Sequence, residues 1–104
     1  MNALTQADAQ LRTKLNMETS RIAWTELLRY FAGGSVIAVS DDLDLVEVAL
    51  RITRDDKDAV AQWLSEQRIA QVSDAQAKAW LEANASLWSV VVRPWVLVQL
   101  NKTV

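Results

Sequence analysis

The segment that most limits the fold of this chain is Leu87–Leu100, in which Arg93 is the one charged residue. Its many β-branched and aromatic side chains predict β structure. Pro94 interrupts the segment, and a residue without an N–H belongs at an edge, a bend or a bulge. Because one residue is too short for a hairpin turn, we expect one bent strand or two diverging strands. A strand this apolar must be central, covered or paired across a subunit boundary, and Pro94 points to an edge, so the segment predicts a homodimer.

A second strand is expected over residues 35–40, where the β-branched sequence SVIAVS is bounded by turn residues. The remaining apolar residues recur mostly at helical spacing. This spacing predicts helices over residues 5–21, 24–31, 44–53 and 56–67, and a further helix that begins after Ser73.

Three of these helices have recognisable start signals. Asp44 with Glu47, and Ser73 with Gln76, have the spacing of capping boxes. Asp55 is expected to cap the helix over 56–67, whose inward apolar stripe would consist of Val60, Trp63 and Leu64.

The segment 44–53 has an alternative interpretation as a strand, because its apolar residues also alternate. The alternating residues are Val46, Val48, Leu50 and Ile52. We favour the helix because the start signal at Asp44 is specific to helices.

Together these elements predict an α+β fold, with a small sheet (residues 35–40 with 87–100) covered by about five helices. The chain has 104 residues, of which 51% are hydrophobic, and this suits one domain over residues 1–104. A chain of this length buries roughly 60–70% of its unfolded surface, which is enough to fold without disulfides or metals.

The composition excludes several kinds of chemistry. The chain has no cysteine and no histidine, so thiol nucleophiles, imidazole triads, disulfides and ordinary zinc sites are excluded. The glycine motifs that hold nucleotide phosphates are absent, and we expect no cofactor. Eleven basic residues face thirteen acidic ones, for a net charge of -2, which argues against a nucleic-acid binder.

The sequence also indicates where the protein resides. Its longest uncharged runs are Tyr30–Ser40 and Ala83–Val92. Both are far shorter than the roughly 20 apolar residues of a membrane-spanning helix. The first eleven residues carry no basic stretch leading into an apolar run, so no secretory signal is expected. We therefore expect a cytoplasmic protein without a membrane segment.

Two clusters of charged residues are candidate sites. Carboxylates bind Mg²⁺ or Ca²⁺, so the acids that begin the stretch 41–58 are candidate metal ligands. These are Asp41, Asp42, Asp44 and Glu47. Acids at helix starts more often cap free N–H groups, and we favour that interpretation. Lys14, Glu18 and Arg21 could hold an anion, but their spacing is also typical of ion pairs on a solvated helix face.

The five tryptophans are the most unusual feature of the composition. Trp24, Trp63 and Trp80 lie on apolar stripes, where core packing explains them. Trp88 and Trp95 flank Pro94 on the β segments. Core positions are favoured for these two as well, but an outward indole there could anchor a partner, because tryptophan is enriched at interface hot spots. Trp88, Pro94 and Trp95 are therefore the interface candidates.

Several short motifs resemble the bacterial domain-of-unknown-function family numbered 2288. The motifs are Lys14-Leu15-Asn16-Met17-Glu18-Thr19, Trp24-Thr25-Glu26-Leu27, Leu43-Asp44-Leu45-Val46-Glu47-Val48-Ala49, Asp55-Asp56-Lys57 with Trp63-Leu64, and Pro94-Trp95-Val96-Leu97-Val98-Gln99. Ala23 departs from the small polar residue expected before the tryptophan. The resemblance spans residues 12–100 and implies a small cytoplasmic bacterial protein. It implies no activity, ligand or catalytic residue.

The sequence leads to two hypotheses about function. The first is a non-enzymatic cytoplasmic protein-interaction domain that forms a homo-oligomer or binds another protein. The reason is that the sequence is rich in tryptophan and β-branched residues and contains no recognisable reactive group. The alternative is a carboxylate-based enzyme or a divalent-metal-binding protein that uses the acidic stretch 41–58. We favour the first, and name no catalytic residue.

Overall fold

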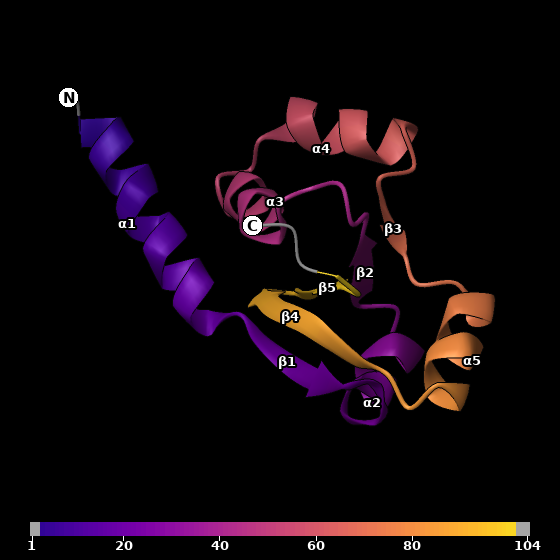
Figure 1. The fold of residues 1–104 in the computed structure, drawn as a ribbon. Coiled ribbons are helices and arrows are strands. Elements are labelled where there is room, and N and C mark those ends of the chain that lie inside the picture. Colours follow the sequence, from indigo (N-terminus) through magenta and orange to yellow (C-terminus); the bar gives the residue numbers. More distant parts are fainter. Residues whose placement is uncertain (1–2, 102–104) are drawn as a thin grey trace.

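The structure is a computed structural model, which describes the backbone of residues 3–101 and the side chains of residues 6–101. Its centre is a mixed five-stranded sheet in the order β1-β4-β5-β2-β3 (Figure 1). The strands are β1 (Ser20–Ala23), β2 (Val36–Val39), β3 (Ile69–Gln71), β4 (Ser86–Val92) and β5 (Trp95–Gln99). β5 and β2 pair in parallel, and every other neighbouring pair is antiparallel.

Five α-helices and one short 3-10 helix complete the described part of the chain. The α-helices are α1 (Ala3–Glu18), α2 (Leu28–Ala32), α3 (Leu45–Thr53), α4 (Lys57–Ser65) and α5 (Asp74–Glu82), and the 3-10 helix η1 (Trp24–Leu27) precedes α2. The predicted α+β fold is confirmed. Within residues 3–101, none of the helices combines the length and the apolar character that a bilayer crossing requires.

The sheet has one hydrophobic core on each face. On the first face α1, α3 and α4 pack against Val39, Val90 and Leu97, and α3 contributes more of the buried side chains than any other element. On the second face η1, α2 and α5 surround Trp24, and the two helix layers are visible on opposite sides of the sheet in Figure 1. Trp24 is almost completely buried, and its ring packs edge-on against the ring of Trp80, with the two ring centroids 5.1 Å apart.

The predicted helix over 5–21 is too long. α1 ends at Glu18, and Ser20–Ala23 form the edge strand β1, which pairs with β4 from Ser20↔Ser89 to Ala23↔Ser86. The apolar spacing continues through Ile22, but β4 presents a row of backbone donors and acceptors that β1 satisfies. Pairing with a distant strand therefore overrides the local helical pattern.

The prediction for the C-terminal segment is wrong in two respects. β4 and β5 form an antiparallel hairpin in which Val92 pairs with Trp95, so Arg93 and Pro94 together make a two-residue turn with a cis peptide bond. Neither strand is an edge, because β4 lies between β1 and β5, and β5 lies between β4 and β2. Pro94 lies in the turn, outside the hydrogen-bonded pairs of the two strands, so its missing N–H costs the sheet no hydrogen bond and proline is tolerated there.

The helix predicted over 44–53 is confirmed as α3. Asp44 caps it by accepting hydrogen bonds from the backbone N–H groups of Val46 and Glu47, at 3.0 and 3.4 Å. Glu47 does not complete a capping box, because its carboxylate pairs with arginines instead.

The other two start signals have opposite outcomes. The capping box of Ser73 and Gln76 is confirmed, with both reciprocal bonds at 3.1 Å. The cap predicted at Asp55 is wrong. Asp56 caps α4 by accepting from the N–H of Ala59 at 3.2 Å, while Asp55 adopts a left-handed conformation with φ 56° in the turn after α3.

Candidate functional site

The four acids proposed as metal ligands lie in separate contacts. Asp44 caps α3. Asp41 accepts from the backbone N–H and the side-chain amide of Asn101, at 3.2 and 2.9 Å. Asp42 accepts from the Ser40 hydroxyl and pairs with Arg68 at 2.9 Å. Among the side chains of residues 6–101, no three acidic groups are placed so that they could hold a metal ion.

Neighbouring side chains lower the pKa of both Asp42 and Glu47. The hydrogen bond from Ser40 lowers the pKa of Asp42, and the charge of Arg68 adds to this effect. Burial by itself raises the pKa of Glu47, but hydrogen bonds from Arg12 and Arg51 and their positive charges outweigh burial and lower it. Both carboxylates are therefore held in the charged form, which suits ion pairing and does not suit general acid catalysis at neutral pH.

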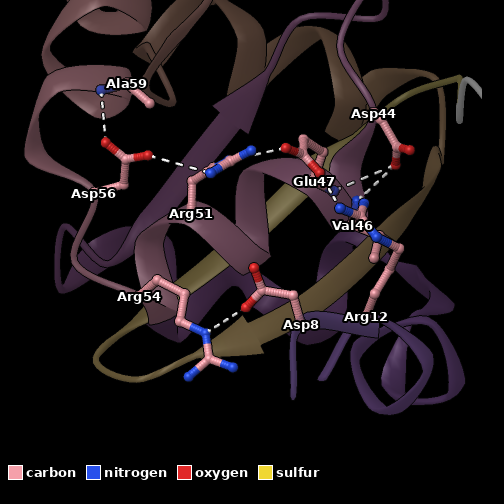
Figure 2. Close-up of polar contacts among 9 residues, drawn as sticks. All are labelled: Asp8, Arg12, Asp44, Val46, Glu47, Arg51, Arg54, Asp56 and Ala59. Carbon is pink, nitrogen blue, oxygen red and sulfur yellow. Dashed lines mark hydrogen bonds and ion pairs between the residues drawn. The ribbon is translucent and has the colours of Figure 1, made fainter. Parts of the chain in front are cut away.

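Glu47 is the centre of an ion-pair network that joins three helices (Figure 2). Its two carboxylate oxygens contact Arg12 of α1 at 2.6 Å and Arg51 of α3 at 2.9 Å. Arg51 also reaches Asp56, the cap of α4, at 3.4 Å. A second ion pair between α1 and the end of α3 joins Asp8 and Arg54 at 2.9 Å, and Figure 2 shows it beside the network. These contacts link α1, α3 and α4 to one another.

The predicted cluster of Lys14, Glu18 and Arg21 does not form. Arg21 lies on β1, where it donates to the backbone carbonyl of Ser86 at 3.3 Å and stands 5.5 Å above the ring of Trp88. The interface candidate Trp88 is half-buried beneath this guanidinium. Lys14 and Glu18 remain at the C-terminal end of α1, where they line a hollow together with Arg93 of the β4–β5 turn.

Lys14, Glu18 and Arg93 line a hollow that we call the turn groove, with a volume of about 650 Å³. Its walls come from the end of α1, the end of α3 and the β4–β5 turn, and Trp95 lines it together with Ile52 and Asp55. A neighbouring hollow of about 450 Å³ lies across the turn, and is also lined by Glu18, Arg93 and Trp95. The turn thus stands between two recesses that share these three residues and Val91.

The interface candidates Trp88, Pro94 and Trp95 have different surroundings. Trp95 is half-buried and lines both recesses, and Pro94 is exposed and lines the second. Trp88 pairs with Gln99 at the far end of the hairpin, away from the turn. Beside Trp95, Val91 is 57% exposed and lines both recesses as well. The structure therefore brings Pro94 and Trp95 together and leaves Trp88 apart.

A third hollow, which we call the α4 pocket, lies between α4, the end of α3 and strands β2 and β3. Its volume is about 500 Å³ and its lining is mostly apolar. The apolar residues include Ile37, Ile52, Val60, Leu64, Ile69 and Trp95. The sequence pattern did not indicate this pocket, because Val60, Trp63 and Leu64 form an inward stripe that is typical of a core helix. Val60 and Trp63 are half-buried, and Leu64 is 51% exposed.

The fold and these hollows define the class of protein: a small α+β domain whose mixed sheet is covered by helices on both faces, with recesses gathered around one hairpin turn. More particularly, the chain belongs to the family DUF2288, described as "Protein of unknown function", whose model matches residues 10–100. The resemblance stated from the sequence motifs is therefore confirmed.

A solved structure supports the same fold. The chain is similar to the protein in the "NMR solution structure of PA1075 from Pseudomonas Aeruginosa", with 41% sequence identity and a TM-score of 0.78. The match covers 99% of this chain and 95% of that one. A comparison with curated proteins found no match. The family model and the solved structure confirm the family and the fold, and neither description names an activity.

Proposed function

We propose that this chain is a non-enzymatic, cytoplasmic protein-interaction domain that self-associates through the turn groove. The observation that carries the proposal is the charge around this groove. Lys14, Glu18, Asp55 and Arg93 line it. Within the described part of the chain, none of the four forms an ion pair. The cytoplasmic location is part of the proposal and rests on the sequence features given above.

The balance of these charges favours a second copy of the chain as the partner. In a two-fold symmetric dimer the same patch lies on both sides of the interface, so the patch must be complementary to itself. Two cations, Lys14 and Arg93, and two anions, Glu18 and Asp55, satisfy this requirement. A nucleic acid or an acidic peptide would instead require an excess of positive charge.

Apolar side chains beside the charges supply the rest of an interface. Trp95 lines the groove, and Val91 leaves 57% of its surface exposed next to it. Interfaces commonly place an aromatic residue in a desolvated centre and charged groups at the rim. Trp95 with the surrounding charges has this arrangement.

Light scattering coupled to gel filtration, over a range of protein concentrations, tests the proposal. We expect a mass that rises toward twice the monomer mass. Arg93→Glu and Glu18→Arg should each shift the equilibrium toward monomer, and an equimolar mixture of the two should recover association because the altered surfaces complement each other. Lys78→Glu, on an exposed site of α5, is the control and should leave association unchanged. A monomer at every concentration would refute self-association.

A further inference from the structure

We infer that the α4 pocket is a binding site for a small, uncharged, ring-containing molecule. This inference does not depend on the proposed self-association, although Ile52, Asp55 and Trp95 line both the α4 pocket and the turn groove. It rests on the shape, lining and charge of the pocket. Its volume of about 500 Å³ lies within the roughly 300–1,000 Å³ of pockets that hold small molecules. Such pockets are mostly apolar with a few polar groups that orient the ligand, and the α4 pocket has this composition.

The position of α4 explains why the pocket is open. α4 contributes no fully buried residue, although Val60 and Leu64 line the pocket on its inner side. The start of the helix is fixed by Asp56, which caps it and also bonds to Arg51 of α3. Its last turn is closed by the N–H of Arg68, which donates to the carbonyl of Trp63 at 2.8 Å, and the chain then enters β3. α4 therefore spans the pocket between α3 and β3, and its apolar side chains remain available to a ligand.

The charges at the rim favour a ligand without net charge. Asp55 and Lys57 stand on the rim with opposite signs, and the rim carboxylate of Asp56 is already paired with Arg51. The two negative charges, of Asp55 and Asp56, balance the two positive charges, of Lys57 and Arg51. Neither an anionic nor a cationic ligand therefore gains a net attraction from them. The indole of Trp95 in the wall offers a flat apolar surface for a ring.

Gln71 supplies a polar group that can orient such a ligand. Its side-chain NH₂ donates to the backbone carbonyl of Gly34 at 3.0 Å, which fixes the orientation of the amide. Its carbonyl oxygen remains able to accept a hydrogen bond beside the pocket that Gln71 lines. A ring that carries one hydroxyl or N–H donor would match this arrangement.

Three compounds that share one ring system but differ in charge test the inference: 1-naphthol, 1-naphthoate and 1-naphthylmethylammonium. Titration of the ¹⁵N-labelled protein, followed by NMR, should show 1-naphthol shifting the amide signals of α4 and β3. We expect its dissociation constant to be at least threefold lower than those of both ions. Tightest binding by either ion would overturn the assignment of an uncharged ligand, and the absence of shifts in α4 and β3 would overturn the site.

A substitution that fills the pocket provides the matched test. Ala61 lines the pocket from α4, and Ala61→Phe should occupy part of its volume and weaken 1-naphthol binding at least fivefold. Ala79→Phe, at an exposed position of α5, should leave binding unchanged, and both spectra report whether each variant is folded. Unchanged binding in a folded Ala61→Phe protein would refute the site. Arg93→Glu should leave 1-naphthol binding intact, because Arg93 does not line the α4 pocket.

Discussion

α3 and α4 are consecutive helices of nine residues each on the same face of the sheet, yet they are buried to very different extents. α3 places five residues completely in the core, among them Leu45 and Leu50, whereas α4 places none there. α3 is also held from outside by ion pairs from Arg12 and Asp8 of α1. Two helices of equal length thus play different roles: α3, which is more apolar and more strongly amphipathic, forms core, and α4 forms the wall of a pocket.

Both helices have an inward apolar stripe, so the presence of a stripe does not by itself tell how closely a helix packs. The pattern predicts which side of α4 faces the protein, and Val60 and Leu64 do line the pocket beneath it. The stripe does not reveal that the start of α4 is tied to α3 through Asp56 and Arg51, at 3.4 Å. A helix placed in this way leaves apolar surface open beneath it, and three pairs of substitutions measure how firmly α3 is held in comparison with other parts of the molecule.

The largest expected difference concerns one leucine on each helix. Leu50→Ala should lower the free energy of unfolding by about 3 to 4 kcal/mol, because Leu50 is 2% exposed and its removal leaves a cavity. Leu64→Ala should lower it by less than about 1 kcal/mol, because this side chain is already 51% exposed. Urea unfolding followed by tryptophan fluorescence measures both values. Equal losses would show that α4 packs as tightly as α3.

A smaller difference is expected at the two helix caps. Asp44 accepts from two backbone N–H groups of α3, whereas Asp56 accepts from one N–H group of α4. Asp44→Ala should therefore cost about 1 to 2 kcal/mol of stability and Asp56→Ala about 0.5 to 1 kcal/mol. Thermal unfolding of both variants gives the comparison. A cost for Asp56→Ala above that for Asp44→Ala would mean that the start of α4 is the more important anchor.

The smallest expected effect is the pH dependence that α3 owes to Glu47. The pKa of Glu47 is lowered from its ordinary value of 4.5, so its contribution to stability is fully present above that pH and is lost as the pH falls through the folded-state pKa. Glu47→Gln should cost about 0.5 to 1 kcal/mol at pH 7 and should reduce the loss of stability between neutral pH and pH 3. Glu82→Gln, whose carboxylate is 4.0 Å from Lys78, is the control and should retain the normal pH profile. Identical pH profiles for the two variants would contradict a role for the network.

Features that depend on neighbouring residues were predictable from the sequence. The caps at Asp44 and Ser73 involve bonds across two or three residues, and both are present. The prediction at Asp55 was wrong by one residue, because the left-handed conformation that ends the turn falls on Asp55 and leaves Asp56 to cap α4. Short-range hydrogen bonding thus located helix starts to within one position.

Features that depend on distant pairing were not predictable in the same way. β1 has four residues, and its assignment as a strand depends on β4, more than sixty positions along the chain. The hairpin at Pro94 could be recognised only once Arg93 was counted in the turn. Among the candidate sites, Trp95 was identified as a residue of interest, but the groove beside it depends on Lys14 and Glu18 from the opposite end of the sequence.

The place of β5 in the sheet has a consequence for how the molecule is synthesised. β5 is the last strand within the described residues, yet it stands between β4 and β2. While the ribosome is still making the residues before Trp95, β2 with β3 and β1 with β4 have no shared strand to join them. The sheet can therefore close only after synthesis has passed residue 99, and a nascent chain stalled before that point would expose two incomplete sheets to chaperones and proteases.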